Sequence, residues 1–118
     1  MLSEPLTIEH MAGQGQGVLR LKGPLTTHNL SPFQNAVRGE SAPTMILDLT
    51  EVPYIDSAGL GSLVSTFVSC HKLGRRVALV GVNKRVAKVF EVTRVESLFL
   101  QFPTLDEAIE ALTSAGHA

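Results

Sequence analysis

A chain of 118 residues with 44% hydrophobic side chains has the length of a single domain, residues 1–118, and enough apolar material for a core without disulfides. Its one cysteine, Cys70, excludes an intrachain disulfide and fits a reducing compartment. The formal net charge of −1 argues against a dedicated nucleic-acid-binding protein. No apolar run approaches the roughly 18 residues that span a bilayer, and the N-terminus lacks the pattern of a signal peptide. We therefore expect a cytoplasmic protein without membrane insertion.

The first predicted elements are two strands that form an N-terminal hairpin. Residues 6–10 and 18–21 have the composition of strands, and the glycine-rich residues 13–17 form the link between them. From residue 18 to residue 22, apolar and basic side chains partly alternate. This alternation predicts a strand with one face packed on the core and the other face in water.

A short helix, a central strand and a longer helix follow. The short helix is expected to have Asn29 or Ser31 as its N-cap and to stop at Gly39. Residues 44–49 are almost continuously apolar, which is typical of a central strand covered on both faces. Residues 57–74 carry apolar side chains at helical spacing, so they predict a helix with one buried face.

The remainder of the chain predicts two more strands and two more helices. Residues 77–80 form a second buried strand, and Asn83 caps the helix after it. Residues 98–102 alternate as a last strand, residues 104–107 form a capping box for the final helix, and residues 114–118 are expected to fray. Strands that alternate with helices imply parallel pairing. The predicted fold is therefore α/β, with a mixed sheet of about five strands and about four helices.

The most informative segment joins the central strand to the second helix. After a turn at Pro53, Asp56 and Ser57 arrive at the start of the helix. The backbone N–H groups of a first helical turn have no partners within the helix, and a small residue there is open to solvent. A serine in this position is a helix N-cap, a nucleophile or a phosphate acceptor. Asp56 is a turn or capping carboxylate, or it positions Ser57 and a partner.

Three neighbouring residues leave further alternatives open. Gly59 and Gly61 lie near the start of the helix, where each glycine costs up to about 1 kcal/mol relative to alanine. Such glycines indicate the close approach of either a neighbouring strand or a partner. Leu60 is either part of the core or a hydrophobic anchor at the rim of the site.

The basic residues are concentrated in one part of the chain. Seven of the ten lie between positions 72 and 94, where Glu91 is the only acid. This concentration is either a solvated face with cations near a helix C-terminus, or a surface for an acidic partner or a phosphate. The four histidines are scattered, so no metal and no cofactor are expected. Without a nucleotide-binding loop or a nucleophile elbow, the chain is not expected to be an enzyme.

Several motifs together resemble a STAS domain over nearly the whole chain. They are the strand that ends in Asp48-Leu-Thr50, the string Ile55-Asp-Ser-Ala-Gly-Leu-Gly61, Gly74 before the next strand, and the end helix over residues 105–112. The STAS domain is the module of bacterial anti-sigma factor antagonists and also occurs in sulfate transporters. The resemblance implies a mixed sheet with helices around it, and a protein-binding switch controlled by phosphorylation.

The resemblance also implies roles for single residues and for partners. In the family, an anti-sigma factor that is itself a serine kinase phosphorylates the serine directly after the aspartate, which is Ser57 here. The unphosphorylated chain would bind that kinase and so release a sigma factor. A serine phosphatase is a further candidate partner, and a monomer or weak dimer is expected. Ala58 stands where relatives often have a second hydroxyl residue, and Thr26 where they favour an aspartate.

Strand-to-helix loops are expected to form the partner surface, because the loops after parallel strands emerge at one edge of a sheet. The resemblance adds the loop around Thr26 to this edge. The residues expected at the surface are Leu25, Thr26, Thr27, Asp56, Ser57, Ala58, Gly59, Leu60, Gly81, Val82, Asn83 and Lys84. The alternative function is a structural STAS subunit of a lipid-transport ATPase complex or of a stress-signalling assembly. A transferase that uses Ser57 as its nucleophile is a third hypothesis.

Overall fold

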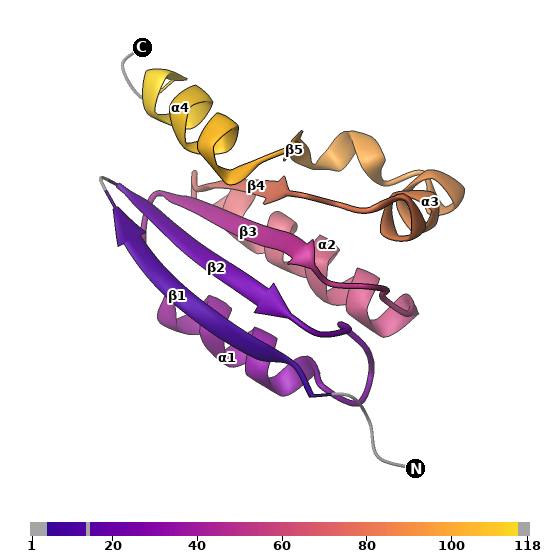
Figure 1. Ribbon diagram of the computed structural model, residues 1–118. Helices are drawn as coiled ribbons and strands as arrows, with labels where there is room; N and C mark the ends of the chain where they lie inside the picture. Colours follow the sequence, from indigo (N-terminus) through magenta and orange to yellow (C-terminus); the bar gives the residue numbers. More distant parts are fainter. Residues whose placement is uncertain (1–4, 14, 116–118) are drawn as a thin grey trace.

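The computed structural model describes residues 5–13 and 15–115, and within them five strands form one mixed sheet (Figure 1). In spatial order the strands are β1 (Thr7–Gly13), β2 (Gln16–Lys22), β3 (Thr44–Glu51), β4 (Arg76–Val80) and β5 (Leu100–Phe102). β1 is antiparallel to β2, and the other neighbouring strands are parallel. The predicted mixed sheet, with a hairpin at its start, is therefore confirmed.

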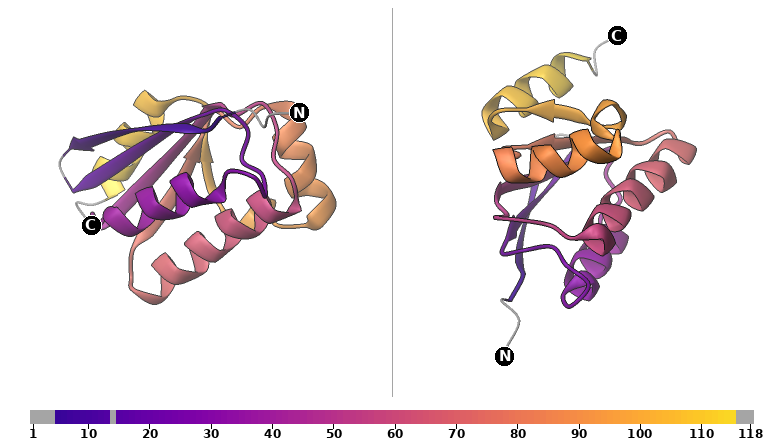
Figure 2. Two further views of the ribbon diagram at one scale, coloured as in Figure 1. Left: turned by 90° about the horizontal axis from the view of Figure 1, so that it is seen from below. Right: turned by 90° about the vertical axis from the view of Figure 1, so that its right-hand side faces the viewer.

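The described residues contain four α-helices and one short 3₁₀ helix. They are α1 (Leu30–Gly39), α2 (Ser57–Lys72), α3 (Lys84–Thr93), η1 (Glu96–Leu98) and α4 (Leu105–Ala115). Apolar side chains of α1, α2 and α3 pack on one face of the sheet, and those of α4 pack on the opposite face. Figure 2 shows α1 and α2 side by side on their face of the sheet. Together these layers enclose the two apolar cores.

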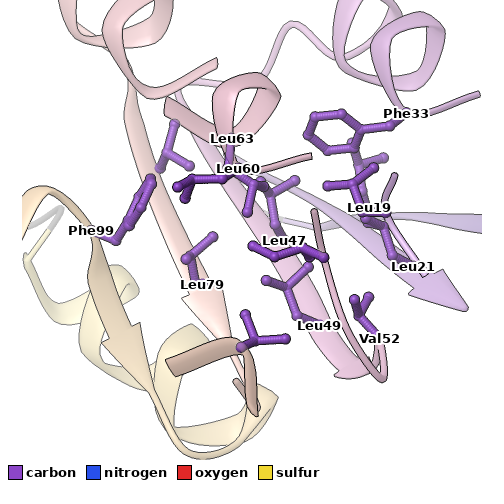
Figure 3. Close-up of a cluster of buried hydrophobic side chains, with 14 of the residues drawn as sticks. Leu19, Leu21, Phe33, Leu47, Leu49, Val52, Leu60, Leu63, Leu79 and Phe99 are labelled. Atoms are coloured by element: carbon purple, nitrogen blue, oxygen red, sulfur yellow. The ribbon is translucent and has the colours of Figure 1, made fainter. Parts of the chain in front are cut away.

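The larger core lies between the sheet and the three helices on its first face. Leu47 of β3 and Leu79 of β4 belong to this core together with Leu63 of α2 and Phe33 of α1 (Figure 3). All four side chains are at most 1% exposed. Full burial of a side chain of this size contributes about 1.5–3 kcal/mol to folding, so this core holds α1 and α2 against the sheet.

The N-terminal hairpin is tighter than the sequence indicated. Gly13 ends β1 and Gln16 begins β2, so most of the predicted glycine-rich link is strand. Gly17 lies within β2, where a β-carbon would overlap the carboxyl group of Glu40. That glycine therefore lies in a strand, against the end of the Glu40 side chain from the C-terminus of α1, and not in a turn.

The prediction of one wet face on β2 is wrong for its first half. Val18 is 5% exposed because Ala108 and Leu112 of α4 pack over it. Farther along the same face, Arg20 and Lys22 are half-buried. The covering helix comes some ninety residues later in the chain, and the alternation within β2 carries no information about it.

One capping interaction and one helix boundary differ from the predictions. Asn29 stands at the N-cap position of α1 but makes no capping hydrogen bond, because its side chain accepts from the Thr26 N–H and donates to the Pro24 carbonyl. α1 stops at Gly39 as predicted. α2 ends at Lys72, two residues before the predicted end.

The last strand and the last helix are both present as predicted, but their boundaries differ from the predicted ones. Leu98 belongs to η1, so the last strand starts at Leu100 and is shorter than predicted. Thr104 caps α4 by accepting from the Glu107 N–H (3.2 Å) and donating to its carboxylate (3.0 Å). α4 continues through Ala115, so the helix includes the first two residues of the segment that is expected to fray. Residues 116–118 of that prediction lie outside the described residues.

Candidate functional site

The carboxyl ends of β2, β3 and β4 meet at one edge of the sheet, on the right in Figure 1, where α1, α2 and α3 begin. Leu25, in the loop after β2, forms a parallel bridge with Ile55, in the loop after β3. The Leu25 N–H donates to the Tyr54 carbonyl (3.3 Å), and the Asp56 N–H donates to the Leu25 carbonyl (3.3 Å). The loop that the family resemblance added to the edge is therefore hydrogen-bonded to the loop that carries Ser57.

Asp56 is the residue that organises this junction. It is the N-cap of α2, and its carboxylate accepts from the Gly59 N–H (2.8 Å) and from the Thr27 N–H of the neighbouring loop (2.9 Å). Burial raises the pKa of the Asp56 carboxyl group, but hydrogen bonds from the backbone N–H groups of Thr27, Gly59 and Ala58 outweigh it, so the pKa lies below its ordinary value. Asp56 is thus ionised at neutral pH and joins two loops.

Ser57 is the first residue of α2 and is exposed. The interpretation of Ser57 as the N-cap is wrong, because Asp56 takes that role by accepting from the Gly59 N–H. Within the described part of the chain, the Ser57 hydroxyl has no hydrogen-bond partner. A hydroxyl that is exposed, at a helix N-terminus and not used in capping is accessible to another protein.

The structure explains the predicted close approach at Gly59 but shows none at Gly61. A β-carbon on Gly59 would overlap the Leu25 carbonyl oxygen, so the close approach is made by the chain's own loop. A β-carbon on Gly61 would meet nothing within 4 Å. Leu60 is 8% exposed and packs in the larger core. Leu60 is therefore part of the core and not a hydrophobic anchor at the rim of the site.

The third loop, between β4 and α3, is tied to the same edge by Asn83. Its side-chain oxygen caps α3 by accepting from the Val86 N–H (2.8 Å), and its side-chain nitrogen donates to the carbonyls of Val52 and Pro53 (both 3.2 Å). The cap was predicted. The link to residues some thirty positions earlier was missed, because a capping pattern uses only the next few residues of the sequence.

Tyr54 and Arg85 form a second contact between these loops. The Arg85 guanidinium carbon lies 4.9 Å from the centroid of the Tyr54 ring, within the range of a cation–π interaction. Arg85 was part of the predicted basic concentration, but no sequence signal pairs it with an aromatic residue. The stacked pair joins the Ser57 loop to the first turn of α3.

The predicted surface residues come together at this edge but differ in exposure. Exposed are Thr27, Ser57 and Lys84; half-buried are Thr26, Asp56, Ala58, Gly81, Val82 and Asn83; buried are Leu25, Gly59 and Leu60. The Thr26 hydroxyl accepts from the His28 N–H (3.3 Å), so it stabilises its own loop. The exposed members can touch a partner directly, and the buried ones give the edge its shape.

Among the described residues there is no cluster of three or more metal-ligating side chains, and no helix is long and apolar enough to cross a bilayer. The edge instead offers hydroxyl, backbone and cationic groups on three hydrogen-bonded loops. Such an arrangement is suited to recognition by another protein and to modification of the exposed hydroxyl of Ser57.

Comparisons with known proteins agree on one family. A family model described as STAS domain matches residues 8–108. An anti-sigma-B factor antagonist of Listeria monocytogenes is 38% identical over 52 residues, which span 44% of this chain and 46% of that relative. The aligned segment is thus less than half the length of that relative.

Solved structures share the fold over most of the chain. The crystal structure of a candidate anti-sigma factor antagonist from Thermotoga maritima has a TM-score of 0.82 at 26% identity, covering 88% of this chain and 92% of that one. The antagonist SpoIIAA in its unphosphorylated form has a TM-score of 0.73 at 22% identity, covering 92% and 96%. SpoIIAA of Bacillus has also been solved in a phosphorylated form, with a TM-score of 0.66 at 22% identity, covering 91% of this chain and 98% of that one. At this identity the SpoIIAA structures show the shared fold alone.

Proposed function

Because the chain belongs to the STAS domain family, we propose that it is an anti-sigma factor antagonist whose binding is switched off by phosphorylation of Ser57. In this proposal the unphosphorylated chain binds an anti-sigma factor that is also a serine kinase, and so frees a sigma factor. The names of the Listeria and Thermotoga relatives support the class of function. The chain acts by binding and not by catalysis.

The single observation that carries the proposal is the position of Ser57. Its hydroxyl is exposed at the N-terminus of α2, on the edge where three loops meet, and Asp56 performs the capping that would otherwise occupy it. The next residue is Ala58, which has no hydroxyl. That phosphorylation is compatible with this fold is supported by SpoIIAA, whose phosphorylated form has been solved.

The physical consequence of phosphorylation differs between the fold and the interface. A phosphate carries about −1.5 to −2 charges at neutral pH, and the positive end of the α2 dipole accommodates negative charge. The fold of the chain is therefore expected to stay as it is. A partner that accepts a neutral hydroxyl must desolvate the new charge, which costs several kcal/mol when no opposite charge faces it.

Phosphate transfer provides the test of the acceptor. Each kinase-type anti-sigma factor of the source organism is purified and incubated with the chain and labelled ATP. We expect one of them to label the wild type and Ser65→Ala, but not Ser57→Ala. Ser65 is the matched control because it is also an exposed serine on α2. Label on Ser57→Ala at the wild-type stoichiometry, or no transfer from any of these kinases, contradicts the proposal.

A further inference from the structure

Three cationic side chains lie in the first two turns of α3. They are Lys84, Arg85 and Lys88, all exposed, and the first turn of this helix contains no acidic residue. A helix N-terminus carries a partial positive charge, so cations there are electrostatically unfavourable. Lys88 pairs with Glu91 one turn later (3.6 Å), and Arg85 lies over the Tyr54 ring. Lys84 has no acidic partner among the described residues, so its charge at this end of the helix points to a role outside the isolated chain.

Most other cations have a structural explanation within the fold. Arg20 pairs with the buried Asp48 (3.2 Å), and Arg75 donates to backbone carbonyls in the connection from α1 to β3 (2.9 Å). By contrast, no acidic side chain among the described residues pairs with Lys84 or Arg85. These two charges are available to an external acidic group.

The structure also fixes these cations relative to Ser57. Arg85 stacks on the Tyr54 ring, and Tyr54 precedes Ser57 by three residues in the same connection. Asn83, directly before Lys84, holds the carbonyls of Val52 and Pro53 in that connection. The cationic turn and the exposed serine therefore belong to loops that contact each other at one edge of the sheet, where a single partner could reach both.

We infer that the first turn of α3, with Lys84 and Arg85, binds an acidic face of the anti-sigma factor; this inference rests on the proposed function and names the chemistry of the partner. An acidic partner also accounts for the sign of the switch, because a phosphate on Ser57 would be repelled by that same face. Cations at the rim of an interface mainly raise the association rate through electrostatic steering, and they do so less at high salt.

The test measures association of the chain with the anti-sigma factor that labels Ser57, by stopped-flow mixing at several salt concentrations. We expect Lys84→Glu to lower the association rate constant about tenfold and to flatten its salt dependence, with little change in the dissociation rate. Lys72→Glu is the matched control, since Lys72 is an exposed lysine at the opposite end of α2. It should stay within about twofold of the wild type.

The outcomes separate this inference from the proposed function. If Ser57 controls binding but Lys84→Glu associates like Lys72→Glu, the acidic-face inference is wrong and the proposed function stands. The ³¹P NMR signal of the chain phosphorylated on Ser57 is recorded as well. If Lys84→Glu leaves the association rate unchanged and shifts only this signal, the cations bind the chain's own phosphate and the inference is also wrong. If no anti-sigma factor labels Ser57, both fall. Unfolding does not confuse the result, because a glutamate at a helix N-terminus should not lower the melting temperature.

Discussion

At the scale of single residues, two glycines of one helix have opposite surroundings. Gly59 lies against the Leu25 carbonyl, whereas Gly61 faces open space. Both have ordinary helical backbones, since neither is among the residues with positive φ. The identity of Gly59 is therefore fixed by packing of two loops, and that of Gly61 is not fixed by the fold.

We expect Gly59→Ala to destabilise the chain by about 1–3 kcal/mol, because the added methyl group must displace a backbone carbonyl. Gly61→Ala should stabilise it by about 0.5–1 kcal/mol, since alanine is the better helix former and has room. Urea unfolding of both variants measures the difference. Equal effects of the two substitutions would show that the contact with Leu25 is not the constraint.

The sequence pattern at the start of α2 could not predict every role of its residues. The pattern at the start of α2 predicted a capped helix and placed Asp56 and Ser57 at it, and both placements are confirmed. It did not decide which of the two is the cap. The hydrogen bond that makes Asp56 the cap comes from the Gly59 N–H, three positions later. Its second partner, the Thr27 N–H, lies 29 positions away in the chain and has no local sequence signal.

At the scale of elements, α3 is joined to the Ser57 loop mainly through the Asn83 side chain. That side chain provides the cap of the helix and two hydrogen bonds to the loop carbonyls of Val52 and Pro53. Serine at this position can cap the helix but cannot donate both bonds. The two functions of Asn83 are thus separable by substitution.

We predict that Asn83→Ser lowers the free energy of unfolding by about 1–2 kcal/mol, from the loss of hydrogen bonds to the loop. Asn83→Ala should lower it by about 1 kcal/mol more, from the loss of the cap. Guanidinium unfolding curves of the two variants give both values. A serine variant as stable as the wild type would mean that the loop carbonyls do not depend on this side chain.

At the scale of the whole molecule, the sequence predicted a hairpin followed by parallel strands, but it predicted neither the spatial order of the strands nor the arrangement of the layers. Continuous apolar runs at β3 and β4 indicated buried parallel strands, and both were confirmed. The burial of Val18 depends on α4, which the sequence places at the other end of the chain. Local periodicity reports which face of an element is apolar, but not which distant element covers it.

The basic residues are unevenly distributed along the chain. The chain has a net charge of −1, yet seven of its ten basic residues lie between positions 72 and 94. Arg75 and Arg76 in this window bond to backbone carbonyls, so the fold uses them. The remaining excess at the start of α3 lies on the sheet edge that carries Ser57, and this coincidence supports one continuous partner surface.

The most direct test of the central claim compares wild type and Ser57→Asp in two assays on the same samples. Calorimetric titration with the anti-sigma factor that labels Ser57 should show affinity falling by at least about 100-fold in the variant, because the partner must desolvate an unpaired carboxylate. The melting temperature should stay within about 2 °C of the wild type, because the charge lies at the favourable end of α2. Unchanged affinity, or a loss of affinity accompanied by much earlier melting, would contradict a switch that acts through the surface charge at Ser57.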